Sequence, residues 1–382
     1  MNFSMRRLLA PVVAACMFSP AGIVCADTVT VLTPDRTVEL ANAVVADGDL
    51  WVLPEDLAQI NGFELKLEGA CCGAVCIPIK RDPAAGFLRE QDGKSYFNLS
   101  KLARTLNESI VAEPEHRVFS FGEVPAVRAA SLESVIAPDF ALPDRTGKLV
   151  HLSDFRGKKV LLVTWASWCG CKLDLAGWQT LYDELKGKNF EIVAVAEDTG
   201  GEAVAGEWYD KAKATYTTLI DRDHVVSSLY HMINVPTGVW VDEQGHVVRP
   251  PEVAYSHNVA LLGIKVNGSD YVAGLRDWVE HGPQSRFVST PDELRQSLAA
   301  RPAPLALADA HFKMATYFKE HKEGELAEKH WKEAQSLSPD NWNYHRQDWS
   351  FTPAATRNWM AKYRALGDKP YYAPLKLPTS DK

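Results

Sequence analysis

Between residues 159 and 245 the hydrophobic positions of the chain alternate between two periodicities. A mainly apolar run over 159–165 has the length of a buried strand, and apolar residues then recur at helical spacing from Trp178 to Leu185. The pattern predicts further strands at 190–196, 217–220 and 239–245, and a second helix at 202–214. Strands that alternate with helices form a central sheet with helices on its faces. We therefore expect an α/β domain in this part of the chain.

The region before this block carries a weak internal repeat. The segment 47–52 returns as the segment 92–97, each beginning with Asp-Gly, and a Leu-Ala pair follows each copy. Each copy predicts a glycine turn, a short strand and one helix, and two copies must pack together to bury a core. We expect a small α+β domain over residues 27–128. Through this pattern alone it resembles the N-terminal module of some copper amine oxidases, which implies no copper here. The weakly patterned segment 124–133 predicts a linker.

Beyond residue 283 the pattern changes to long helices. The segment 305–318 predicts one helix, and Ala327, Trp331 and Ala334 mark one face of another before Pro339. Within a helical region at 285–382, this pair resembles a single tetratricopeptide-type hairpin. One such repeat forms no solenoid, so a helical cap on the central domain is favoured over a groove that binds a client protein.

The segment 341–349 combines aromatic and polar side chains at unusual density. We expect Trp342 and Trp349 to hold the helices against the central domain, with Arg346 and Asp348 paired at its edge. A recognition surface is the alternative.

The first 26 residues have the pattern of a secretory signal peptide. Arg6 and Arg7 precede the apolar run 8–18, and Ala26 precedes the polar Asp27. A lipobox that ends at Cys16 is the alternative and would add a lipid anchor. The apolar run is too short to span a bilayer, so we expect an exported protein, in the periplasm or an equivalent compartment, with no transmembrane segment. The net charge of −8 argues against a nucleic-acid partner.

Three cysteines lie close together near the N-terminus, at Cys71, Cys72 and Cys76. An exported chain meets an oxidising compartment, and the spacing of Cys71 and Cys76 suits a disulfide across a hairpin that turns at Gly73. Two alternatives remain open. The three thiolates can form a site for a soft metal such as Cu(I) or Zn, or Cys72 can exchange with the remaining cysteine pair.

That pair, Cys169 and Cys171, stands between the first predicted strand of the central domain and the helix that follows it. A helix N-terminus stabilises a thiolate, because its unpaired N–H groups and dipole favour negative charge. Cys169 is therefore the candidate nucleophile for thiol-disulfide exchange, and Cys171 can resolve the mixed disulfide.

The segments 137–140 (Ala-Pro-Asp-Phe), 157–162 and 165–169 (Trp-Ala-Ser-Trp-Cys) resemble exported thioredoxin-like proteins of the TlpA/ResA type, within the redoxin or AhpC/TSA group. The resemblance covers about 135–282 and implies a thioredoxin-like domain at 133–282. It implies a thiol-disulfide oxidoreductase that needs no cofactor, with protein thiols and disulfides as substrates and an upstream redox partner.

The same resemblance implies roles for further residues. Pro236 matches the cis-proline of the loop that lies beside the cysteines and binds the substrate backbone, with Trp168, Val235 and Thr237 as substrate contacts. The expected proton carrier is one of the carboxylates that follow the second strand, Glu197, Asp198 and Glu202, of which Glu197 is preferred. A solvated loop of acidic residues is the alternative.

The chain departs from the family in one respect, because Cys169-Gly170-Cys171 is one residue shorter than the usual Cys-x-x-Cys. Positions i and i+2 of a helix point in nearly opposite directions, so we expect closure to need distorted backbone at Gly170 and to give a strained, oxidising disulfide. Two alternatives to exchange are a thiol peroxidase with an antioxidant role, and a soft-metal-binding or chaperone protein without turnover. The peroxidase motif is incomplete, since Leu162 and Ala166 replace its Pro and Thr.

Overall fold

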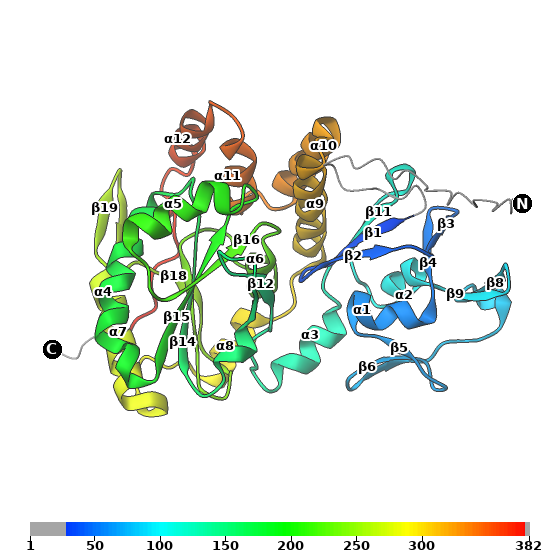
Figure 1. Cartoon of the computed structure of the whole chain (residues 1–382), viewed down its shortest axis with the longest axis horizontal. Helices are drawn as coiled ribbons and strands as arrows, with labels where there is room; N and C mark the ends of the chain where they lie inside the picture. The colour runs from blue at the N-terminus through cyan, green and yellow to red at the C-terminus, as the bar shows by residue number, and fades with distance from the viewer. Residues whose placement is uncertain (1–27, 379–382) are drawn as a thin grey trace, which may run out of the picture.

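The computed structural model describes residues 28–378, so the expected signal peptide at 1–26 lies outside the described residues. Figure 1 shows an N-terminal domain, in blue and cyan, and a larger central domain, in green and yellow, with the helices α9 and α10 between them. Within residues 28–378, no helix has both the length and the apolar composition needed to cross a membrane.

The N-terminal domain contains two four-stranded sheets, with orders β10-β11-β1-β2 and β3-β4-β9-β8, and a small sheet β5-β6-β7. The two copies of the internal repeat meet here, because β4 pairs with β9 and the helix after each strand packs into one core with Val52 and Phe97. Its elements are β1 (Val29–Leu32), β2 (Thr37–Leu40), β3 (Val44–Ala46), β4 (Asp49–Val52), α1 (Leu57–Asn61), β5 (Glu64–Leu65), β6 (Ala70–Cys72), β7 (Val75–Ile77), β8 (Leu88–Gln91), β9 (Lys94–Asn98), α2 (Leu99–Thr105), β10 (Ile110–Glu113) and β11 (Val118–Phe121).

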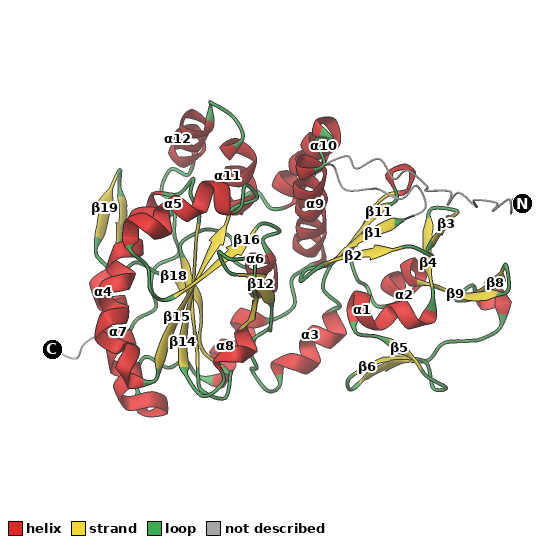
Figure 2. Cartoon of the chain, viewed as in Figure 1, coloured by secondary structure: helices red, strands yellow, loops and turns green. Residues whose placement is uncertain are grey.

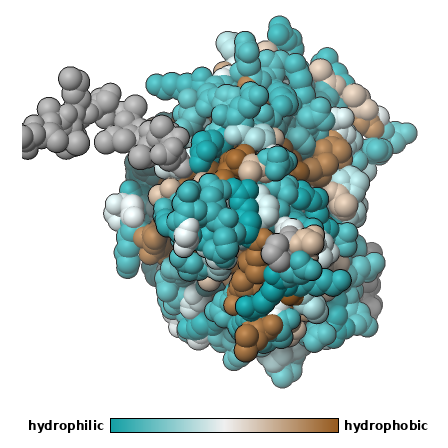
Figure 3. Space-filling model, turned by 90° about the vertical axis from the view of Figure 1, so that its right-hand side faces the viewer, coloured by the Kyte–Doolittle hydropathy of each residue, from teal (hydrophilic) through white to brown (hydrophobic). Residues whose placement is uncertain are grey.

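The face of the molecule formed by the N-terminal domain is mostly hydrophilic, with separate small hydrophobic patches (Figure 3).

The segment 124–133, predicted as a linker, forms the helix α3 (Pro125–Leu132). Proline is favoured in the first turn of a helix, where its missing N–H costs nothing. No residue of α3 is fully buried, but Val127 packs against the N-terminal core and Leu132 packs against a core of the central domain. Arg128 of α3 donates to the carbonyl of Leu298 at 2.8 Å and so contacts the central domain.

The central domain is built on a five-stranded sheet of order β16-β15-β14-β17-β18, in which β14, β15 and β16 are parallel and β17 and β18 run antiparallel (Figure 2). Its strands are β12 (Ala141–Pro143), β13 (Leu149–His151), β14 (Lys159–Trp165), β15 (Phe190–Glu197), β16 (Thr217–Asp221), β17 (Thr237–Val241), β18 (Val247–Val253), β19 (Val259–Leu261) and β20 (Ile264–Val266).

Helices cover both faces of this sheet and bury two separate cores. The helices α4 (Leu175–Leu185), α5 (Glu202–Ala212) and α7 (Gly268–His281) pack on one face, and α6 (Val225–Tyr230) and α8 (Pro291–Leu298) pack on the other. The first face buries Trp178, Tyr209 and Trp278, and Cys169 and Cys171 belong to the same core. The cysteine pair is thus held by the larger of the two apolar layers.

The C-terminal region contains α9 (Ala303–Glu320), α10 (Gly324–Leu337), α11 (Trp342–Ser350) and α12 (Ala355–Ala365). The helices α9 and α10, which we expected to cap the central domain alone, pack between the N-terminal and central domains. Phe312 and Trp331 share a core with Val118 of the N-terminal domain, while Asp309 accepts from Ser228 of α6 at 3.0 Å. Because both sides of α9 are covered, it is buried around most of its circumference, which a single amphipathic stripe does not predict.

Candidate functional site

The site begins where β14 ends. Cys169 caps the N-terminus of a short 3₁₀ helix, η5 (Gly170–Asp174), which continues into α4. Both Cys169 and Cys171 are free thiols and buried, with 3% and 2% of their surface exposed. The backbone N–H of Cys171 donates to Sγ of Cys169 at 3.3 Å. The helix therefore directs an unpaired N–H at the candidate nucleophile.

The two thiols differ in acidity. Burial alone would raise the pKa of Cys169, but hydrogen bonding from Cys171 and the charge of Arg346 outweigh it and lower the pKa to about 6. Burial raises the pKa of Cys171 well above the ordinary value, and a hydrogen bond to the Cys169 sulfur adds to the effect. At neutral pH Cys169 is the thiolate and Cys171 holds its proton.

The loop before Cys169 is fixed by the strand next to β14. Asp198, directly after β15, accepts from the backbone N–H and the hydroxyl of Ser167, both at 2.7 Å. Lys172 donates to the carbonyl of Ser167 at 2.7 Å. These bonds fix the position of Trp168 and Cys169 relative to the sheet.

The loop before β17 lies against the cysteine and contains a cis peptide bond between Val235 and Pro236. The thiol of Cys169 lies 3.6 Å from the carbonyl oxygen of Val235, and Thr237 donates its hydroxyl to Asn234 O at 2.7 Å. The carbonyl of Val235 also accepts from the hydroxyl of Tyr372 at 3.0 Å. In the structure, Val235 and Thr237 are buried and the Val235 carbonyl already has partners.

A cavity of about 410 Å³ opens beside Cys169. Its walls come from the active-site loop, the β18–β20 region, α11, α12 and the segment after α12, and its lining is mainly apolar and aromatic. The residues that line it include Trp168, Cys169, Leu173, Asp174, Tyr255, His257, Leu261, Arg346, Trp349, Trp359, Tyr371 and Tyr372. Trp168, predicted as a substrate contact, is therefore on the cavity wall.

Glu197 does not belong to this cavity, and its prediction as proton carrier for the cysteines needs correction. Side chains alternate along a strand, and Glu197 shares the face of Val193 and Val195, whereas the cysteines pack with the residues of the opposite face. Its carboxylate accepts from Ser227 and Asn343. Counting along β15 from Ile192, which faces the cysteines, would have predicted this orientation.

The carboxylate that does line the cavity belongs to Asp174. In a 3₁₀ helix the side chains at i and i+3 lie above one another, so Asp174 stands over Cys171. Burial raises its pKa, although Ser256 and His257 donate to it, the first through its backbone N–H at 2.7 Å. The sequence contained this signal, since Asp174 stands three residues after Cys171.

The backbone at Gly170 is undistorted in the dithiol form, whereas the distortion was expected for the closed disulfide. Its φ lies outside the left-handed region, and a Cβ at this position would meet nothing within 4 Å. The structure holds Cys169 and Cys171 as thiols, so Gly170 is under no steric demand in the dithiol form.

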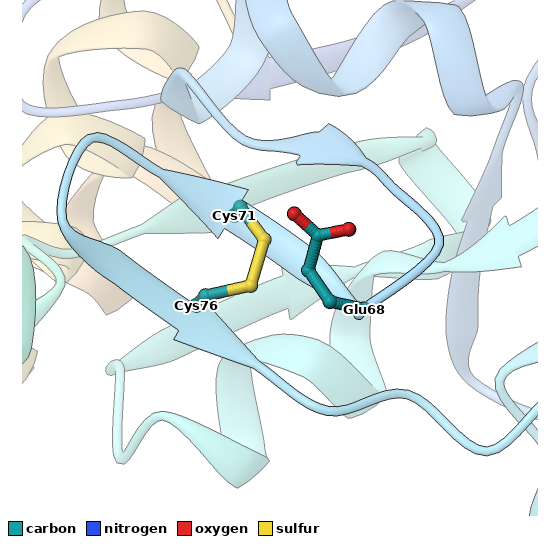
Figure 4. Close-up of side chains that lie close together, drawn as sticks. All are labelled: Glu68, Cys71 and Cys76. Carbon is teal, nitrogen blue, oxygen red and sulfur yellow. A yellow bond between two sulfur atoms is a disulfide. The ribbon is translucent and has the colours of Figure 1, made fainter.

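The N-terminal cysteines form a separate centre. Cys71 and Cys76 face each other across β6 and β7 and are joined by a disulfide, with Glu68 beside it (Figure 4). The disulfide uses two of the sulfurs that the three-thiolate metal alternative requires. Cys72 is a free thiol that packs on the core of its own domain, and Figure 1 shows β6 far from α4. The structure therefore keeps Cys72 away from the Cys169 site.

Arg346 is the residue of the site whose position the sequence analysis missed. It makes no bond with Asp348, which accepts from Gln335 at 2.9 Å instead. Its guanidinium donates to Tyr371 OH at 2.8 Å and to the carbonyl of Trp168 at 3.1 Å, and it lies 4.6 Å from the centre of the Trp168 ring. The dense aromatic and polar segment 341–349 was the only sign of this role in the sequence.

Comparison with known proteins gives a consistent result. The profile of the AhpC/TSA family matches residues 135–249. The thiol-disulfide oxidoreductase ResA of Oceanobacillus iheyensis is 37% identical over 116 residues, which are 29% of this chain and 60% of that protein. ResA of Bacillus subtilis is 31% identical over 131 residues, or 34% of this chain and 72% of that protein.

Among solved structures, the thioredoxin domain of a thiol-disulfide oxidoreductase from Bacteroides vulgatus is 24% identical, with a TM-score of 0.32, and the match covers 38% of this chain and 96% of that one. The chain spans only 60% to 65% of the length of the first curated relatives that it matches.

Proposed function

Because the chain belongs to the AhpC/TSA family, with ResA thiol-disulfide oxidoreductases among its relatives, we propose that it is an exported enzyme that exchanges disulfides through Cys169 and Cys171. The observation that carries this proposal is the placement of two free thiols at the start of η5 beside the cavity, where the backbone N–H of Cys171 donates to Sγ of Cys169. The lowered pKa of Cys169 and the raised pKa of Cys171 agree with it. Ordered exchange needs one thiolate that attacks first and a second thiol that stays protonated until the mixed disulfide has formed.

In the first step the Cys169 thiolate attacks one sulfur of a substrate disulfide, forms a mixed disulfide and releases the other substrate sulfur as a thiolate. Cys171 then loses its proton and attacks Sγ of Cys169, which expels the second substrate sulfur and closes the Cys169–Cys171 disulfide. The substrate gains two electrons and the protein loses two. A dithiol protein upstream restores the reduced pair by the same steps. The reverse sequence oxidises a substrate dithiol.

The proposed proton acceptor for Cys171 is Asp174. Its position one 3₁₀ turn after Cys171 supports this role, as does burial, which raises the pKa of its carboxyl. His257 contacts the same carboxylate and is itself 60% exposed, so it can pass the proton to solvent.

The proposed substrates are protein thiols and disulfides in the periplasm or an equivalent exported compartment. Leu173 and Leu261 support this, because they line the cavity and are 70% and 64% exposed, a surface that an apolar polypeptide segment can cover. We assign the α9–α10 pair a structural role, supported by its burial between two domains.

The test is a redox titration by thiol trapping in glutathione buffers, on protein in which Cys71, Cys72 and Cys76 are all replaced by Ser, so that only the Cys169–Cys171 pair can titrate. We expect one two-electron transition and catalytic reduction of a protein disulfide by dithiothreitol. Cys171→Ser should accumulate the mixed disulfide, and Cys169→Ser should form none.

If no internal disulfide forms at any potential, the exchange mechanism is wrong. Peroxide consumption that survives Cys171→Ser but not Cys169→Ser would then indicate a peroxidase. Stoichiometric bound metal in reduced protein would indicate the soft-metal alternative.

A further inference from the structure

Arg346 is a partly buried cation whose direct partners are neutral. Its guanidinium bonds to the hydroxyl of Tyr371 and the carbonyl of Trp168, and stacks on the Trp168 ring. Among residues 28–378, no carboxylate forms an ion pair with it. Burial of a cation without an anionic partner is unfavourable, so a negative charge close to Arg346 would be stabilised.

The group that can supply this charge is the thiolate of Cys169. Arg346 holds the carbonyl of Trp168, the residue that directly precedes Cys169, and both Arg346 and Cys169 line the same cavity. The other cation near the sulfur, Lys172, is directed away from it. Its ammonium donates to the carbonyl of Ser167 at 2.7 Å and lies 4.1 Å from the centre of the Trp208 ring.

We propose that Arg346, supplied by α11 outside the thioredoxin-like domain, is the counter-ion of the Cys169 thiolate and sets the reactivity of the nucleophile. This inference rests on the proposed function, because it deepens the role of the same sulfur. The C-terminal region is then part of the active centre as well as part of the scaffold.

The arrangement around the guanidinium is suited to this role. Tyr371 fixes one end of the guanidinium, and the Trp168 carbonyl fixes the other, so the positive charge keeps its place when the sulfur loses its proton. A charge that is positioned before the reaction costs no reorganisation when the anion forms. An attacking thiolate with a nearby cation also leaves more readily in the reverse step, because a lower thiol pKa gives a better leaving group.

Several other groups lie around the Cys169 sulfur and also influence its ionisation. Cys171 donates to Cys169 from η5, and Asp174 stands across the same cavity with His257. Tyr255, Tyr371 and Tyr372 approach from the segment after β18 and from the segment after α12, and burial raises the pKa of each. These tyrosines stay neutral when Cys169 ionises, so Arg346 is the group among these whose positive charge is permanent.

The test measures the acidity of Cys169 directly, as the pH dependence of its alkylation by iodoacetamide in the full chain with Cys72→Ser. Arg346→Gln keeps a hydrogen-bonding side chain but removes the charge, and Arg346→Lys keeps the charge. Arg276→Gln is the matched control, since Arg276 pairs with Glu184 on the surface, 2.7 Å away.

We expect the alkylation midpoint of Arg346→Gln to rise towards that of an ordinary cysteine, with a rate at pH 6 at least about tenfold below that of the parent. Arg346→Lys should recover most of the shift, and Arg276→Gln should not move the midpoint. A structural role alone would lower the melting temperature and leave the midpoint unchanged.

An unchanged midpoint in folded Arg346→Gln overturns the proposal. If that variant does not fold, Tyr371→Phe takes its place, because it removes the bond at one end of the guanidinium and should raise the midpoint by a smaller amount. The result separates this inference from the proposed function. If Arg346→Gln shifts the alkylation midpoint but the parent protein has no exchange activity, only the proposed function is wrong. If the parent exchanges disulfides but Arg346→Gln leaves the midpoint unchanged, only this inference is wrong.

Discussion

The two cysteine centres of this protein contain the same side chains in opposite chemical states. Cys71 and Cys76 face each other across two antiparallel strands and are closed as a disulfide, with Cys72 left over. Cys169 and Cys171 stand at the start of a helix as two buried thiols. The difference is one of backbone geometry, because a hairpin holds opposite residues side by side, whereas the start of a helix leaves Cys169 and Cys171 as separate thiols in this structure.

The electrostatic surroundings of the two centres differ as well. Burial raises the pKa of Cys72, and the nearby charge of Glu64 raises it further. Cys169 is more deeply buried than Cys72, yet its pKa is lowered, because Cys171 and Arg346 outweigh burial. Reactivity therefore follows the charges around a thiol rather than its exposure.

The largest expected effect separates the two centres by activity. Cys169→Ser removes the nucleophile and should reduce disulfide exchange by at least about a thousandfold. Cys76→Ser breaks only the distant disulfide and should change the rate by less than about twofold. The measurement is reduction of a protein disulfide by dithiothreitol, with both variants compared at equal folded concentration. Equal losses in the two variants would mean that the centres act together.

The pH dependence of alkylation should next distinguish Cys169 from Cys72. Because the pKa of Cys169 is about 6, its alkylation rate should be level above pH 7 and fall about tenfold for each unit below pH 6. Cys72 has a raised pKa, so its alkylation should still increase above pH 9. Mass spectrometry of peptides labelled for short times at each pH checks both curves. Faster labelling of Cys72 than of Cys169 at pH 7 would contradict the assignment.

Removal of the hairpin disulfide should act on stability alone. The disulfide closes a loop with a sequence separation of 5, for which chain entropy gives about 2 kcal/mol of stabilisation. Cys71→Ala with Cys76→Ala should lower the free energy of unfolding of the N-terminal domain by about this amount, as measured in urea. The exchange rate at Cys169 should remain that of the parent, and a lower rate would show coupling between the domains.

The smallest expected effect is the difference in stability between alanine substitutions at Gly73 and Gly170, the glycines next to the two cysteine centres. Gly73 has a φ of 56°, where an L side chain is disfavoured, so Gly73→Ala should cost about 1 kcal/mol of stability. Gly170 has no such φ, and a Cβ there meets nothing, so Gly170→Ala should change the stability of the reduced protein by less than about 0.5 kcal/mol. Thermal unfolding of both variants with Cys169 and Cys171 reduced measures the difference. A larger cost at Gly170 would contradict this account.

The sequence predicted the central sheet well and the region outside it less well. The strand at 159–165 is β14 residue for residue, because a buried parallel strand is apolar throughout. In contrast, α3 buries no residue fully, and the hairpin β19–β20, which borders the cavity, has strands of only three residues each. Local pattern predicts elements that bury a face and misses those that do not.

Within the site, the sequence identified the sulfurs and missed part of their surroundings. Cys169 and Cys171 carried a local signal, because they follow a strand and begin a helix. Glu197 was assigned to the wrong face of the sheet, although strand alternation contains the answer. Arg346 could not be placed from the sequence, because its contact with Trp168 joins residues 178 positions apart and depends on how α11 docks.

This long separation has a consequence for the order in which the protein is made. A chain is synthesised from its N-terminus, so Cys169 is present well before α11 and the segment that carries Tyr371. Until those residues dock, the sulfur lacks the cation that we propose for it, and only the hydrogen bond from Cys171 favours its thiolate. We therefore expect Cys169 to reach its full reactivity only when the C-terminal region has docked. Cys71, Cys72 and Cys76 are made before that point.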